Sequence, residues 1–260
     1  MIDWEGSLGY YIIGEDFGRI EDFKERGYAI IRCDASYKGG LGTCSISIET
    51  KNKAYKSTEK SFREKGSTRA ELKSIYYSLM RLRNLNFNNV LILNDNQYAV
   101  SLVSGFFKPQ TTREVCSKIN KELKNSQKNI KFGLVRSKLN RKVDQSAKKQ
   151  LRKYRKDQLE KYNERVKRVN CMITESQKHS CEKVNGGFSV ITESGRKYLV
   201  SFDDLPTCNC YYWRKNWENK AEKIVKSKAL PCSHICCAAE FSERDVFEIF
   251  EHQITGGIKL

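Results

Sequence analysis

Short apolar runs and alternating stretches follow one another along the first part of the chain. An apolar run at residues 28–36 stops at a glycine cluster, which predicts a buried strand. Residues 43–50 alternate polar and apolar side chains as a half-buried strand does, and residues 53–62 do so more weakly. These three segments predict an antiparallel meander.

Helical and extended patterns then alternate. Ser67 and Thr68 offer a helix cap before an apolar stripe that runs from Leu72 to Leu82. The later pattern predicts strands over 90–93 and 130–135 and helices over 98–103 and 111–123. Together the segments predict an α/β fold, a mixed five-stranded sheet flanked by helices. Before residue 27 the signal is weak: an edge strand over 10–13 and a short helix over 20–24, with no function assigned.

Four carboxylates fall where this architecture gathers side chains. Asp34 and Asp95 end two strands expected to be neighbours, Glu71 lies in the first turn of the helix between them, and Asp144 opens the helix after the last strand. Four like charges share one corner only with raised pKa values or bound cations. Each residue alone is more commonly a cap or a surface group. The joint pattern predicts two Mg²⁺ (or Mn²⁺) ions that support cleavage of a phosphodiester.

The segments around these carboxylates resemble type 1 ribonuclease H over roughly residues 28–150. The matching segments are Asp34-Ala35-Ser36 before the glycines, Thr68-Arg69-Ala70-Glu71-Leu72, Asn94-Asp95-Asn96-Gln97-Tyr98 and Asn140-Arg141-Lys142-Val143-Asp144-Gln145-Ser146-Ala147. The resemblance implies that the four acids are the metal ligands and that the RNA strand of an RNA/DNA hybrid is cut. It also assigns nucleic-acid binding to Arg69, Gln97 and Asn140.

Three departures from that family stand out. The family commonly has a histidine in the loop before the last aspartate, but residues 134–139 contain none, and Arg136 and Lys138 are the polar substitutes. Ser67 replaces an asparagine, and no basic, tryptophan-rich protrusion separates Asp95 from Asp144. These departures favour slower turnover or a different substrate-binding element.

The charge of the chain predicts a polyanionic partner. The net charge is +17 and the pI about 9.4, which indicates nucleic acid first and an anionic membrane surface second. Residues 138–168 hold thirteen basic and four acidic side chains on a predicted amphipathic helix. Such runs are usually solvated faces, yet part of this one directly follows Asp144. The residues expected to bind phosphate are Lys148, Lys149, Arg152, Lys153 and Lys156.

The ten cysteines are concentrated near the C-terminus. Cys208 and Cys210 are followed, after 21 intervening residues, by Cys232 and His234. Ligands two apart on an extended chain point to the same side, so the two pairs predict one structural, tetrahedral Zn²⁺ site. The alternative is four unrelated buried residues. The apolar surroundings of Cys33, Cys44 and Cys116 instead predict small core residues.

A predicted hairpin over 188–202 precedes the first cysteine pair, and together they resemble a SWIM zinc finger, a module that binds DNA or protein. The spacer interleaves aromatic and basic residues, which suits single-strand stacking and equally suits the core of a small domain. These residues are Tyr211, Tyr212, Trp213, Arg214, Lys215, Trp217, Lys220 and Lys223. A protein partner for the finger therefore stays open.

These patterns predict an N-terminal extension over 1–27, a catalytic domain over 28–150, a basic connecting helix over 151–182 and a zinc domain over 183–260. No apolar run nears the roughly 20 residues that span a bilayer, and no signal-peptide pattern opens the chain. We therefore expect a cytoplasmic protein without a membrane partner. The alternatives are a transposase- or integrase-like DNA nuclease, against which the position of Glu71 argues, and a catalytically weak nucleic-acid-binding protein.

Overall fold

The computed structural model divides into two compact units, Met1–Arg155 and Lys156–Leu260. The boundary lies inside helix α5 (Ser137–Ser176), whereas the sequence placed divisions at 27, 150 and 182. The residues that the structure describes are 4–5, 10–14, 17–202, 206–215 and 230–255.

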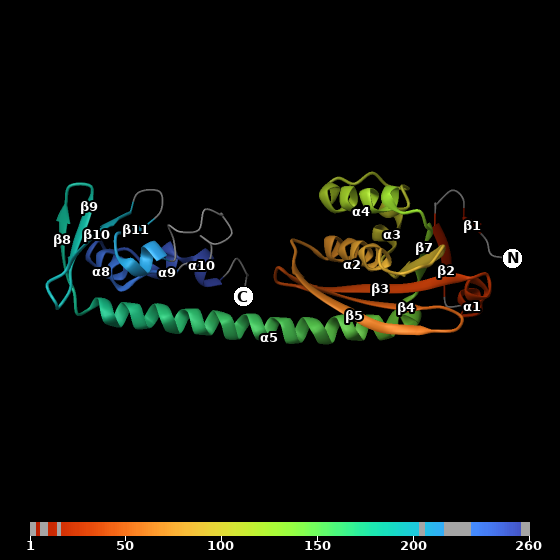
Figure 1. The fold of residues 1–260 in the computed structure, drawn as a ribbon, viewed down its shortest axis with the longest axis horizontal. Coiled ribbons are helices and arrows are strands. Elements are labelled where there is room, and N and C mark those ends of the chain that lie inside the picture. Colours follow the sequence, from red (N-terminus) through yellow and green to blue (C-terminus); the bar gives the residue numbers. More distant parts are fainter. Residues whose placement is uncertain (1–3, 6–9, 15–16, 203–205, 216–229, 256–260) are drawn as a thin grey trace. The chain divides into compact units, whose positions relative to one another are not determined.

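Unit 1 is built on one mixed sheet (Figure 1). The strand order is β1-β2-β7-β6-β3-β4-β5, in which β3, β4 and β5 are antiparallel and β2, β7, β6 and β3 are parallel. The strands are β1 (Trp4–Glu5), β2 (Tyr10–Gly14), β3 (Tyr28–Lys38), β4 (Leu41–Glu49), β5 (Ala54–Arg63), β6 (Asn89–Asn94) and β7 (Asn129–Val135). The mixed five-stranded arrangement predicted from the sequence is confirmed, and β1 and β2 extend it. Because β1 pairs with β2, residues 10–13, which were expected to form an edge strand, lie one strand inside the edge of the sheet.

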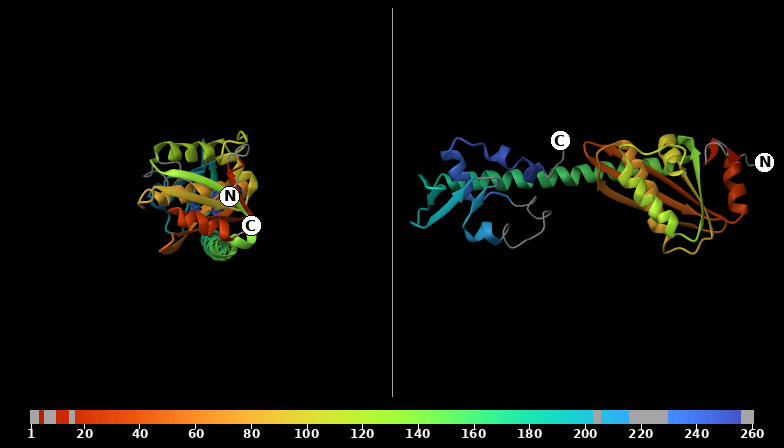
Figure 2. Two further views of the ribbon diagram at one scale, coloured as in Figure 1. Left: turned by 90° about the vertical axis from the view of Figure 1, so that its right-hand side faces the viewer. Right: turned by 90° about the horizontal axis from the view of Figure 1, so that it is seen from above.

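Helices cover both faces of this sheet (Figure 2). α2 (Ser67–Leu82), α3 (Gln97–Val103) and α4 (Arg113–Asn125) share one buried core with Ile31 and Cys33 of β3. α1 (Phe17–Glu25) and the start of α5 share the other core with Ile30. Consecutive β3 side chains therefore face opposite layers, as strand geometry requires. Cys33, Cys44 and Cys116 are buried, as predicted.

Three local expectations are wrong. Asp34 does not end its strand, because β3 continues to Lys38 while its parallel pairing with β6 stops at Arg32 and Leu93. The cap of α2 is Gly66, which is extended and makes no side-chain cap hydrogen bond. Asp144 does not open its helix: α5 begins at Ser137, so the aspartate lies about two turns inside it.

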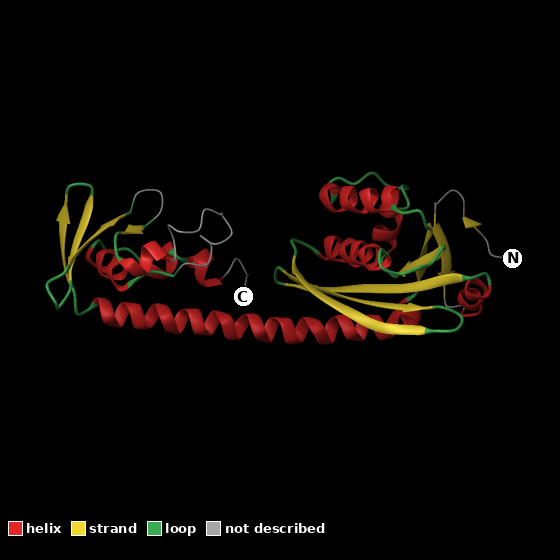
Figure 3. Cartoon of the chain, in the orientation of Figure 1, coloured by secondary structure: helices red, strands yellow, loops and turns green. Residues whose placement is uncertain are grey.

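Unit 2 holds a four-stranded antiparallel sheet with short helices packed on it (Figure 3). The strand order is β11-β10-β9-β8, and α8 contacts β8, β9 and β10. The elements are β8 (Ser180–Val184), β9 (Gly187–Ile191), β10 (Lys197–Ser201), β11 (Thr207–Cys208), α6 (Tyr211–Trp213), α8 (Ser233–Phe241), α9 (Val246–Ile249) and α10 (Glu251–Thr255). The predicted hairpin corresponds to β9 and β10. Trp213, Ile235 and Phe250 are among the fully buried side chains of its core, to which Val169 of α5 also belongs.

Candidate active site

Asp34 is a buried carboxylate on β3. Asp34 is only 3% exposed, and its Oδ2 has no hydrogen-bond partner among the described residues. Burial, together with the negative charges of Glu71, Asp95 and Asp144, raises the pKa of Asp34 to about 9. An ionised carboxylate in this position therefore requires a compensating cation.

Glu71 reaches the same place from the first turns of α2. Its Oε2 accepts hydrogen bonds from the Ala35 backbone N–H at 3.2 Å and from the Asn94 side-chain amide at 3.1 Å. Burial raises the pKa of Glu71 to about 8, and the hydrogen bond from Asn94 partly opposes that rise. Glu71 is thus fixed by β3 and β6 at the point where these strands diverge.

Asn94 positions this carboxylate, a role that sequence reasoning did not assign. The side chain is buried, and its amide nitrogen also donates to the Cys33 carbonyl at 3.1 Å, while its oxygen accepts from the Asn96 backbone N–H at 2.8 Å. A buried amide ties β6 to β3 with every group used. The signal was an asparagine at the last position of an otherwise apolar strand, where an unpaired polar group would be costly.

Asp95 and Asp144 are half-buried and complete the cluster. Asp95 follows β6 directly, and Asp144 projects from α5, whose docking on β4 includes a 2.7 Å hydrogen bond from Thr43 Oγ1 to the Ala147 carbonyl. The Lys148 ammonium lies 2.8 Å from the Asp144 carboxylate, one turn along the helix. The charges of Glu71, Asp95 and Asp144 all act on Asp34, so the four acids that the sequence singled out lie near one another, but their carboxylate oxygens are not gathered as tightly as the ligand atoms of a metal-binding group.

This arrangement suits divalent cations of the Mg²⁺ class. Carboxylate oxygens are the ligands such cations use, and a buried oxygen without a protein partner among the described residues is a place for one. The charges of Glu71, Asp95 and Asp144 all act on Asp34, so a cation bound here would relieve repulsion among all four.

The residues assigned to nucleic-acid binding are placed differently from one another. Arg69 donates to Glu64 at 2.6 Å, to Glu114 at 3.2 Å and to the Thr111 carbonyl at 3.2 Å, so acceptors around the starts of α2 and α4 use its guanidinium. Gln97 is exposed at the start of α3. Asn140 is 0% exposed, and its amide nitrogen donates to the Cys33 carbonyl at 3.1 Å, so it braces β3 from below the surface.

The basic cluster of α5 lies on the side of the helix that faces away from the sheet. Lys149, Arg152, Lys153 and Lys156 are exposed, whereas Ala147 and Leu151 of the same turns are buried. Lys148 instead pairs with Asp144. The predicted apolar stripe fails at Leu159, which is 47% exposed.

The connection before α5 is too short to form the loop in which the family that the sequence resembles commonly has a histidine. β7 ends at Val135 and α5 begins at Ser137, so Arg136 alone joins them. A one-residue connection leaves no loop in which a histidine could reach over the carboxylates.

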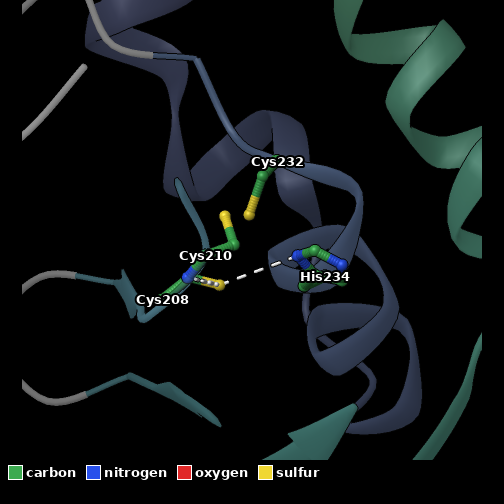
Figure 4. A group of neighbouring side chains, drawn as sticks. All are labelled: Cys208, Cys210, Cys232 and His234. Atoms are coloured by element: carbon green, nitrogen blue, oxygen red, sulfur yellow. Dashed lines mark hydrogen bonds between the residues drawn. The ribbon is translucent and has the colours of Figure 1, made fainter. Parts of the chain in front are cut away.

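Unit 2 gathers Cys208, Cys210, Cys232 and His234 into one cluster (Figure 4). The three sulfurs and one imidazole nitrogen all lie within 4.8 Å of one another, and His234 Nδ1 is 3.8 Å from Cys208 Sγ. Three thiolates and one imidazole are a donor set suited to tetrahedral Zn²⁺. Among the described residues no other group of three or more such ligands meets this distance.

Backbone and aromatic contacts orient these ligands. The Cys210 and Trp213 backbone N–H groups lie 3.4 Å and 3.3 Å from Cys208 Sγ and Cys210 Sγ, which stabilises thiolate. The His234 ring stacks on Tyr198, with the centroids 3.9 Å apart. These contacts hold Cys208, Cys210 and His234 in place.

The spacer aromatics divide between core and surface. Trp213 is 0% exposed and packs edge-on against Phe250, whereas Tyr211 is 75% exposed. The expectations about Trp217, Lys220 and Lys223 fall outside the described residues. Within the described part of the chain, no helix is long and apolar enough to cross a membrane.

Comparison with known proteins gives structural neighbours alone. Models of protein families give no match, and neither do curated proteins. The chain is similar to RNase H1 of the archaeon Halobacterium salinarum, with 11% identity over 45% of this chain and 92% of that one and a TM-score of 0.42. It is also similar to LC11-RNase H1, solved in complex with an RNA/DNA hybrid, with 18% identity, coverages of 45% and 91% and a TM-score of 0.42. A third is the N-terminal RNase H domain of a Mycobacterium tuberculosis protein, with 14% identity and coverages of 45% and 94% at a TM-score of 0.42.

Proposed function

We propose that unit 1 is a divalent-metal-dependent ribonuclease that hydrolyses the RNA strand of RNA/DNA hybrids. The observation that carries this proposal is the buried Asp34 carboxylate, whose Oδ2 has no partner among the described residues and on which three further carboxylates act. A cluster of this kind is unfavourable for folding alone, because its members repel one another and lose hydration. Its value lies in binding cations.

Each acid has a distinct place in this proposal. Asp34 offers a buried oxygen to the cations, and Glu71 is held toward them by Ala35 and Asn94. Asp95 and Asp144 are more exposed than Asp34, which leaves them accessible to a substrate. Two cations held here would supply an activated water and stabilise the leaving oxygen of an in-line displacement. The carboxylates would set where those cations lie relative to the scissile phosphate.

The basic cluster of α5 supports the choice of a nucleic-acid substrate. Lys149, Arg152 and Lys153 are exposed within about three turns of Asp144 on the same helix, where they would neutralise backbone phosphates without reading sequence. We leave Asn140 and Arg69 out of the binding set, because the first is buried and the second is engaged by acceptors of the fold. Gln97 remains in it.

In the same proposal the zinc module is a SWIM-type finger that assists binding, with Zn²⁺ in a structural role. Its ligand set fills a tetrahedron, so the module would contribute surface and not chemistry. A protein partner and a cytoplasmic location remain predictions from the sequence.

The test compares matched RNA/DNA, RNA/RNA and DNA/DNA duplexes with purified protein and Mg²⁺ or Mn²⁺, labelled on each strand in turn. We expect cleavage of the RNA strand of the hybrid alone. Cleavage of DNA/DNA would favour the transposase-like alternative, and binding of hybrid without cleavage under either metal would favour a binding protein. Asp95→Asn, purified in parallel, controls for contaminating nuclease.

A further inference from the structure

The surface beside the cysteine-histidine site combines an exposed ring with positive charge. Tyr211 immediately follows the Cys210 ligand, and its ring is the most exposed of the large hydrophobic side chains in the described ranges, at 75%. The Lys215 ammonium lies 5.7 Å from the centre of this ring. A cation at that distance from a ring face is attracted to it and holds the ring in place.

Arg214 contributes a second cation to the same surface. Its Nε donates to the Asn209 carbonyl at 2.9 Å, which anchors one end of the guanidinium to the backbone between the two cysteines. Within the described part of the chain, no hydrogen bond engages its two terminal nitrogens. The exposed side chain therefore presents the fork of donors that matches a phosphate.

A third contribution comes from Tyr212 on the same short helix. Its ring is 45% exposed. Trp213, between these residues and the core, is fully buried. The helix thus separates one aromatic that stabilises the module from two that lie on its surface.

We propose that Tyr211, Tyr212, Arg214 and Lys215 form a stacking surface for unpaired nucleotides, so that the preferred substrate is a hybrid with a single-stranded extension. This inference rests on the proposed function for its substrate but not for the binding surface itself. An exposed ring between cations fits a base between phosphates, and stacking is indifferent to base identity. A duplex cannot use the ring, because its bases are already stacked on one another.

The occupant is nucleic acid because of charge complementarity. Arg214 and Lys215 place two positive charges beside the Tyr211 ring, and backbone phosphates complement these charges. Tyr211 directly follows the Cys210 ligand and begins α6, so its backbone is fixed before a base binds, which limits the conformational freedom lost on binding. Extensions of DNA and of RNA share the required chemistry, and the experiment separates them.

The test measures binding of the zinc-loaded full-length protein by fluorescence anisotropy in Ca²⁺, to limit cleavage. The ligands are a blunt hybrid, the same hybrid with an oligo-dT or an oligo-U extension, and each single strand alone. We expect the extended hybrid to bind more tightly than the blunt one. Tyr211→Ala should weaken binding of extended hybrid and of single strand by about 5- to 150-fold and leave the blunt hybrid unchanged. Tyr211→Phe should retain the parent affinity.

Phe241→Ala is the matched control, because it removes another exposed ring of the same module. Zinc content and circular dichroism confirm that each variant is folded. Equal affinity of the parent for blunt and extended hybrids, or no effect of Tyr211→Ala on single strands, overturns this inference and leaves a hybrid nuclease intact. If the parent protein cleaves no hybrid but Tyr211→Ala loses single-strand binding, the nuclease is rejected and the stacking surface is retained. Tyr211-dependent capture of a protein without single-strand binding would also overturn it.

Discussion

In unit 1 the four acids come from β3, α2, the end of β6 and α5, whose positions are set by a large core that exists without any cation. In unit 2 the four ligands come from β11, the turn after it and the start of α8, around a small core that includes the ligands themselves. The first site gathers four carboxylates of like charge, and the second gathers three sulfurs and one imidazole nitrogen within 4.8 Å of one another. A stable framework can hold a site together in spite of the repulsion among its charges, and such a site is suited to chemistry. A site whose ligands form part of the core is suited to folding.

The sharpest test of this comparison removes one acid. Asp34→Asn should lower the rate of hybrid cleavage by about three or more orders of magnitude, because a cation that activates water and stabilises the leaving group would lose a ligand. The fold of unit 1 should persist, since the substitution removes a repelled charge. Single-turnover cleavage at saturating hybrid is the measurement, with Asp22→Asn on the surface of α1 as control. Cleavage by Asp34→Asn at the parent rate would remove the carboxylate site from the mechanism.

The opposite behaviour is expected of the second site. Cys232→Ser or zinc chelation should unfold unit 2 and leave unit 1 folded, because the free energy of metal binding in small zinc modules is about 10–16 kcal/mol and is largely their folding free energy. Hydrogen exchange followed by mass spectrometry should quicken in β8–β10 and α8 and stay slow in β3 and β6. Cys171→Ser, an exposed cysteine outside the cluster, is the control. If β3 and β6 lose protection as well, the two units do not fold independently.

The third prediction concerns pH in the metal-free protein. The folded pKa of Asp34 is raised from 3.8 to about 9 and that of Glu71 from 4.5 to about 8. The folded state therefore keeps protons that the unfolded state releases, so the free energy of unfolding of unit 1 should fall as the pH rises from about 5 to about 8. Mg²⁺ should offset this loss, because it binds the ionised folded state. Protection of β3 amides in hydrogen exchange at several pH values is the readout.

Asp34→Asn sharpens this prediction, since it should flatten the pH dependence and weaken the effect of Mg²⁺. Equal slopes in the parent and the variant would show that Asp34 ionises normally in the folded protein.

The smallest effect is expected from the basic cluster. Replacing Lys149, Arg152 and Lys153 by alanine should weaken binding of hybrid and reduce the slope of log affinity against log salt by about 0.9 for each phosphate that the protein no longer neutralises. Replacing Lys118, Lys121 and Lys124 of α4 removes the same charge elsewhere in unit 1 and should leave that slope closer to the parent value. Identical slopes in the two triple variants would make the cluster an ordinary solvated face.

Much of unit 1 was predictable because each of its central strands and helices has a clear period. The acids were predictable as a group, since strand ends of one sheet meet at one edge. Their exact setting was not: the apolar pattern, which predicted a strand over 28–36, could not reveal that β3 runs on to Lys38 beyond its pairing with β6, because that extension is stabilised by pairing with β4 and not by burial on both faces. Asn94 and Asn140 were likewise hidden, because their roles depend on one carbonyl, that of Cys33, far away in the sequence.

Unit 2 was harder to predict because its strands are short and its core depends on the metal ligands. The turn at Asn185 and Gly186 joins β8 to β9, and Gly186 has a φ of 82°. An asparagine-glycine pair is a strong hairpin signal, but the polar β8 gave no apolar run to place before it. Tyr211 and Trp213 illustrate the remaining difficulty, since nearby aromatics of similar type have opposite surroundings.

β3 stops pairing with β6 just before Asp34, so the paired part of the strand fixes the position of Asp34, whereas the part of β3 beyond it can differ in length. Side chains alternate along a strand, so one residue inserted between Arg32 and Asp34 would turn the carboxylate toward the opposite layer. Beyond Ser36 and Thr43, β3 pairs with β4, and β4 also pairs with the end of β5. Equal shortening or lengthening of β3, β4 and the end of β5 preserves the register at Asp34. Insertions or deletions of this kind would change how far unit 1 extends over a substrate and leave its carboxylates in place.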